Sequence, residues 1–150
     1  MRTVIYALSA CWAFVLLAAA AAGQEQERPS FSGNWQFDAS KSELHTSKIS
    51  SATWVIEEGG NSIHISQTEN GKPKKTELQC TTDGKECKFP GDRRDSFWFN
   101  GPMLVDMETK SEHVTRFRMK ISDDGKTLTV EVTPIVPQSD KIDTMVFQKQ

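Results

Sequence analysis

The chain has 150 residues, and its 18 Lys and Arg side chains against 20 Asp and Glu side chains give a formal net charge of −2. This balance lacks the basic excess that usually accompanies nucleic-acid binding, so we expect no nucleic-acid partner. Hydrophobic residues make up 37% of the chain. That share predicts a folded globular domain rather than a disordered chain.

The first 23 residues have the three parts of a secretory signal peptide. Arg2 supplies a positive start, residues 4–22 form an apolar run, and Ala21 and Gly23 are small residues at the −3 and −1 positions of a cut before Gln24. The alternative is a retained membrane anchor, because a run of this length can span a bilayer. Cleavage predicts a secreted or periplasmic protein with no membrane span afterwards and a polar, disordered lead-in over residues 24–30.

Cleavage of the leader leaves two cysteines, Cys80 and Cys87. Asp83-Gly84 lies between them, and this pair between strand-like runs is typical of a hairpin turn. Two antiparallel strands leaving the turn would bring the sulfurs together, and an oxidising compartment favours a disulfide. The three histidines are scattered singly, so we expect no zinc site, which needs four ligands at a compact spacing.

From Phe31 onward, short runs of alternating apolar and polar residues are separated by turn residues such as Gly59-Gly60 and Asn70-Gly71. This period of two predicts half-buried β-strands. Only residues 38–51 lack the pattern, and they have room for one short helix. Because nearly every connection is short, we predict an all-β fold, an antiparallel up-and-down barrel of about 8–10 strands over residues 31–150, rather than a Greek-key sandwich.

A Gly-x-Trp pattern, Gly33-Asn34-Trp35, lies on the first predicted strand and resembles the opening of the lipocalin and fatty-acid-binding superfamily. Residues 38–42, 81–87 and 124–130 look like a group of secreted bacterial lipocalin-like proteins, and this likeness covers about residues 31–150. The resemblance implies a lipocalin-like barrel with structural roles for Gly33 and Trp35, and it places Trp35 at one closed end. The Arg-x-Tyr pair with which fatty-acid-binding proteins typically hold a ligand carboxylate is replaced by Arg116-Phe117-Arg118.

Aromatic and thioether side chains on the predicted inward faces form a candidate pocket for a small apolar ligand, and they would serve equally well as a filled core. This candidate set is Phe97, Phe99, Met103, Met107, Phe117 and Met119. His113 shares the parity of Phe117, so it would either face the barrel mouth, where it could bond a ligand or haem iron, or lie in water at the strand end. Arg93 and Arg94 lie in a polar loop, as weak candidates for an anion contact at the mouth or as solvated charges.

The sequence contains no nucleophile elbow, phosphate-binding loop or dinucleotide fingerprint, and no catalytic constellation can be assembled from it. We therefore expect a monomeric, non-enzymatic protein that binds a small, mainly apolar, lipid-like molecule and uses no cofactor or metal. The alternative is a structural or protein-interaction barrel with a filled core and no ligand. The missing Arg-x-Tyr pair favours that alternative.

Overall fold

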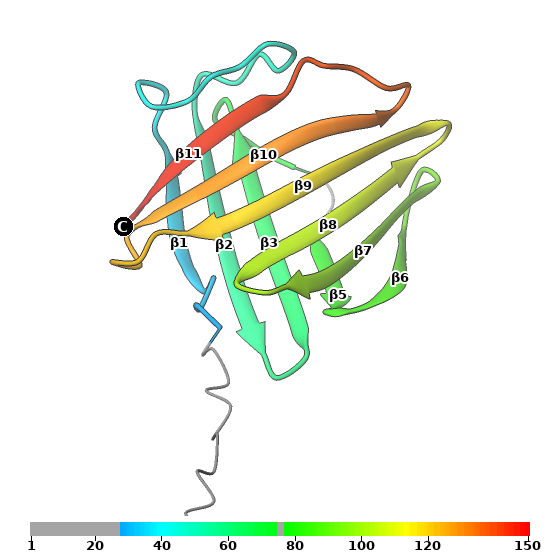
Figure 1. Ribbon diagram of the computed structural model, residues 1–150, viewed down its shortest axis with the longest axis horizontal. Helices are drawn as coiled ribbons and strands as arrows, with labels where there is room; N and C mark the ends of the chain where they lie inside the picture. Colours follow the sequence, from blue (N-terminus) through cyan, green and yellow to red (C-terminus); the bar gives the residue numbers. More distant parts are fainter. Residues whose placement is uncertain (1–27, 75–76) are drawn as a thin grey trace, which may run out of the picture.

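The computed structural model describes residues 28–74 and 77–150, and the predicted signal peptide lies outside them (Figure 1). The described residues form eleven strands in one antiparallel sheet that curls into a barrel, which confirms the predicted all-β antiparallel class. The strands are β1 Gly33–Phe37, β2 Ala52–Gly59, β3 Ser62–Glu69, β4 Lys72–Pro73, β5 Leu78–Thr81, β6 Asp83–Phe89, β7 Arg93–Asn100, β8 Met103–Lys110, β9 His113–Ile121, β10 Thr127–Val136 and β11 Asp143–Lys149.

Residues 38–51, where the alternation is missing, contain no helix. They form turns and a single bridge between Glu43 and Thr144. Asp38 accepts a hydrogen bond from the Ser40 N–H at 3.1 Å, which closes a tight turn in place of a helix cap. The described part of the chain also holds no helix that is long and apolar enough to cross a membrane.

Most strands pair with their neighbours in sequence, in the order β4-β3-β2-β1-β11-β10-β9-β8-β7-β6. The pairing of β1 with β11 brings the two ends of the domain together, with Trp35 opposite Lys149 and also opposite Trp54 of β2. Because directly opposed residues point to the same face of a sheet, this register sends both tryptophans into the barrel.

The two edges of the curled sheet meet at β5 and β6, which lie side by side without a backbone ladder between them. We call this junction the seam. β5 pairs with β3, and β6 pairs with β7, so the predicted hairpin between the two cysteine strands is wrong. Thr81 Oγ1 donates to the Asp83 carboxylate at 2.6 Å, and this carboxylate also accepts the Lys85 N–H. The resulting turn directs the chain toward β7 and does not fold it back on β5.

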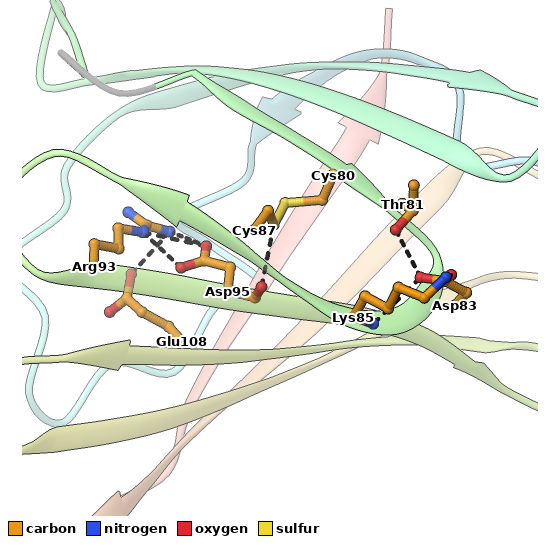
Figure 2. Close-up of a disulfide and its surroundings, with 8 residues drawn as sticks. All are labelled: Cys80, Thr81, Asp83, Lys85, Cys87, Arg93, Asp95 and Glu108. Atoms are coloured by element: carbon orange, nitrogen blue, oxygen red, sulfur yellow. Dashed lines mark hydrogen bonds and ion pairs between the residues drawn. A yellow bond between two sulfur atoms is a disulfide. The ribbon is translucent and has the colours of Figure 1, made fainter.

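The predicted disulfide is confirmed, and it crosses this seam. Cys80 lies on β5 and Cys87 on β6, with their Cα atoms 5.6 Å apart (Figure 2). Cys80 is almost fully buried against the core. The disulfide therefore joins two strands that no backbone ladder connects in the described structure.

One end of the barrel is filled with large side chains. The fully buried residues there include Phe31, Trp35, Phe97, Leu128 and Phe147. The Trp35 indole N–H donates to the Phe31 carbonyl at 2.9 Å, so its polar atom is satisfied.

Gly33 leaves room for the Lys149 side chain at this packed end of the barrel. It has a φ of +148°, and a Cβ at this position would lie 2.7 Å from Lys149 Cε. The Lys149 ammonium in turn lies 5.2 Å from the centroid of the Trp35 ring. Residues 28–30 of the predicted lead-in also lie against the barrel, where the Arg28 guanidinium stacks 4.7 Å from the Phe99 ring centroid.

We expect the double substitution Cys80→Ser and Cys87→Ser to lower the free energy of unfolding by about 2.5 kcal/mol, because the short closed loop restricts the unfolded chain. Urea denaturation of the oxidised wild-type protein and of the variant measures this difference. Adding a reductant should lower the wild type to the level of the variant and leave the variant unchanged. Equal stability of the oxidised wild type and the variant would show that the disulfide does not stabilise the fold.

Candidate functional site

A cavity of about 430 Å³ occupies the barrel end opposite Trp35. Its walls come from β9, the starts of β2, β5, β7 and β11, the later parts of β3, β8 and β10, and the loops before β2 and beside β4. The apolar part of the lining is Ile49, Trp54, Ile65, Leu78, Phe117, Met119, Val132 and Met145. The barrel is thus packed at one end and hollow at the other.

Charged side chains of β7 and β8 also enter this cavity wall. The Arg93 side chain is 15% exposed, and its Nε donates to Asp95 Oδ1 at 2.9 Å while its Nη2 donates to Asp95 Oδ2 at 2.6 Å. The same Nη2 lies 2.9 Å from Glu108 Oε2 (Figure 2). One guanidinium therefore neutralises parts of two carboxylates, the geometry in which buried charges are best tolerated.

Asp106 is a third inward carboxyl group, and it has no such partner. Its residue is 3% exposed, and its Oδ1 has no hydrogen-bond partner among the described residues. It lies opposite Phe97 and Phe117 in the two neighbouring strands. Burial raises the pKa of Asp106 well above its ordinary value, the nearby Asp95 raises it further, and Arg93 opposes both effects.

The loop before β2 is held over the cavity by Asp143 of β11. The Asp143 carboxylate accepts the backbone N–H groups of His45, Thr46 and Ser47 and the hydroxyls of Thr46 and Ser47, at 2.5 to 2.9 Å. Burial alone would raise the pKa of Asp143, but these hydrogen bonds hold it well below its ordinary value. Since Ser47 and Ile49 line the cavity, this anchor fixes part of its wall.

The structure brings together only part of the candidate pocket. Phe117 and Met119 line the cavity. Phe97 is fully buried in the core and does not line it, and Phe99 is half-buried beside Phe31, with their ring centroids 6.2 Å apart.

The predicted inward position of Met103 and Met107 is wrong. β8 pairs Leu104 with Met119 and Asp106 with Phe117, so its even-numbered residues face the interior. The tight turn at residues 101–102 pairs Asn100 with Met103 and thereby reverses the parity between β7 and β8. This turn was the signal that could have placed Asp106 and Glu108 inside.

The remaining candidates divide between the cavity and the surface. His113 is exposed at the start of β9, opposite Lys110, and does not line the cavity, so it cannot face a ligand there. Arg94 is exposed and lies 3.7 Å from Glu86. Arg93 does line the cavity, but held by carboxylates rather than free at the mouth. Within the described ranges, no three His, Cys, Asp or Glu side chains are grouped so as to hold a metal ion.

No protein-family model matches the chain, and no curated protein is similar to it in sequence. Solved structures are similar in shape. The fatty-acid-binding protein 1 of Echinococcus granulosus superimposes with a TM-score of 0.62 at 14% identity, over 79% of this chain and 96% of that protein. The chain has the fold of the fatty-acid-binding proteins.

Two further structures share this fold. A fatty acid transporter named REP1-NXSQ matches with a TM-score of 0.61 at 15% identity, over 79% of this chain and 95% of its own. A mutant of the fluorescent protein UnaG matches with a TM-score of 0.59 at 17% identity, over 80% of this chain and 96% of its own. At these identities the likeness establishes the architecture alone.

We expect Asp143→Asn to destabilise the protein by about 2–4 kcal/mol at pH 8, because the substitution removes the charged acceptor of five hydrogen bonds. A lowered carboxyl pKa contributes stability above its ordinary value of 3.8 and loses it as the pH falls. The difference in urea midpoint between wild type and variant should therefore shrink toward pH 3. A constant difference across this range would contradict the assignment.

Asp106→Asn is expected to have the opposite effect and to stabilise the protein by about 1–3 kcal/mol at pH 8, because it removes a buried negative charge whose Oδ1 has no hydrogen-bond partner among the described residues. A raised carboxyl pKa means that stability is lost as the pH rises above the ordinary value of 3.8. Chemical denaturation at pH 3.5 and pH 8 should show a gain only at pH 8. The exposed Asp140→Asn is the matched control, with no change expected; a loss of stability in Asp106→Asn at pH 8 would refute the expectation.

Proposed function

We propose that the protein is a non-enzymatic binding protein that holds a small, mainly apolar, lipid-like molecule in the open half of its barrel. The observation that carries the proposal is the cavity of about 430 Å³, a size in the range of small-molecule sites. Its apolar wall offers aromatic, thioether and branched surface in one concave space. A filled core, which the alternative of a structural or protein-interaction barrel requires, does not leave such a volume.

Fold likeness supports the same function as an analogy. The similar structures include proteins named for binding or transporting fatty acids. In those names the ligand is a molecule with a long apolar part, which is the class that the apolar wall of this cavity suits. The analogy carries over the ligand class only, because one fold serves many ligands.

Export to an oxidising compartment is part of the proposal. The Cys80–Cys87 disulfide supports it, because structural disulfides form and persist in secreted and periplasmic proteins. The signal-like leader of residues 1–23 supports it independently. We propose that the exported protein works as a monomer.

Gentle extraction followed by native mass spectrometry should show a bound apolar compound on a chain that starts near Gln24. Val132→Phe should weaken the binding of this compound and reduce the rise in melting temperature caused by the neutral dye Nile red, because the larger side chain occupies part of the cavity that Val132 lines. Thr133→Phe is the matched control, since Thr133 lies on the opposite face of β10. If no compound co-purifies and no apolar molecule raises the melting temperature, the binding function is refuted and the interaction-barrel alternative replaces it.

A further inference from the structure

On the β7 and β8 side of the cavity, acids outnumber basic groups. Three carboxyl groups, those of Asp95, Asp106 and Glu108, surround the single guanidinium of Arg93. The inward residues of the neighbouring β9 wall are Thr115, Phe117 and Met119, which add no charge. This side of the cavity therefore has an excess of hydrogen-bond acceptors.

The charge of Arg93 is already shared by two carboxylates, which makes it a poor receptor for a third. Its Nε and Nη2 atoms already donate to Asp95, and Nη2 also faces Glu108. A ligand carboxylate brought to the remaining Nη1 atom would meet Asp95, Glu108 and Asp106 as neighbours of the same charge, around one guanidinium whose charge two of them already share.

Asp106, in contrast, lacks a hydrogen-bond donor at one of its oxygens within the described part of the chain. Its Oδ1 is buried and has no donor among residues 28–74 and 77–150, and the residue lines the cavity. A ligand that brings N–H groups to the Asp106 carboxyl group would give it a charged donor and lie close to Glu108, while its apolar part contacts Phe117, Met119 and Val132. A positive charge at this point would also favour the ionised form of Asp106, against the burial that raises its pKa in the empty cavity.

We propose that the cavity recognises an amphiphilic amine: a ligand with an apolar chain or ring system whose ammonium group binds at Asp106 and Glu108. This inference rests on the proposed binding function and names the chemistry of its ligand. The charges are opposite to those of a site that binds a ligand carboxylate, because here the protein supplies the acids and the ligand supplies the cation. Ammonium–carboxylate hydrogen bonds are among the strong ones in a partly buried site.

The mouth of the cavity carries the remaining charged groups and offers the competing arrangement. Lys74 is paired with Glu69 at 2.7 Å, and Lys48 is at the rim. A fatty acid that inserts its chain and leaves its carboxylate outside would lie near Lys48. Its affinity would not depend on Asp106, and the two arrangements can therefore be separated by substitution.

The test uses three probes with the same chain: dodecylammonium, dodecanol and dodecanoate, each below its micelle concentration, added to the disulfide-bonded protein at pH 7. Displacement of bound Nile red measures the three dissociation constants. We expect dodecylammonium to bind at least about tenfold more tightly than dodecanoate, with dodecanol between them, as expected for one favourable against one unfavourable buried charge contact.

Two variants locate the preference. Asp106→Asn should reduce dodecylammonium affinity about tenfold and leave dodecanol within about twofold, because the charge is lost and the shape is kept. Glu108→Gln frees one side of Arg93 and should shift the preference toward dodecanoate. Asp140→Asn, the same chemical change at an exposed position outside the cavity, should leave all three constants unchanged.

The outcomes separate the two proposals. If dodecanoate binds as tightly as dodecylammonium or more tightly, the amine inference is overturned and the binding function stands. If Asp106→Asn keeps the full ammonium preference, the assignment to Asp106 is overturned. If none of the three probes displaces the dye, and native mass spectrometry finds none bound, the cavity binds no apolar chain and both proposals fall.

Discussion

The alternation of side chains along a pleated strand is the constraint on which the rest of this structure depends. Because the sheet curls around one interior, every second side chain of each strand points into that interior, whatever its polarity. In β7 and β8, the side chains that point inward include those of Arg93, Asp95, Asp106 and Glu108. Buried charges need partners, and the single guanidinium can serve only two of the three acids. The chemistry of the cavity is thus a consequence of strand register.

The fold could be predicted because the signal that defines it is local. In β9, Phe117 and Met119 alternate with Arg116 and Arg118, and such runs with short connections specify an antiparallel barrel without knowledge of any long-range contact. The Cys80–Cys87 bridge was predictable for a related reason, since seven positions of separation kept the two sulfurs close whichever strands carried them.

The candidate site was predictable only in part, because it depends on pairing between strands. In β8, Leu104, Val105 and Asp106 are all buried, so apolar character does not reveal which face is inward. The parity is decided by the turn that sets Asn100 opposite Met103. Met103 and Met107 suggest an inward odd-numbered face from sequence alone, whereas Asp106 and Glu108 are the inward residues. The cysteine hairpin failed similarly, since β5 pairs with β3, which precedes it, and not with β6, which follows it.

The disulfide across the seam has a consequence for how the chain is connected. Between Cys80 and Cys87 two covalent routes run in parallel, one through the backbone of the exposed turn at Asp83 and one through the sulfurs. A single cut in that turn would leave both halves in one molecule, with β5 still bonded to β3 and β6 to β7. The peptide bonds of this turn are therefore not needed to hold the two halves together. The turn is the natural place to cut the backbone and create a new pair of chain termini.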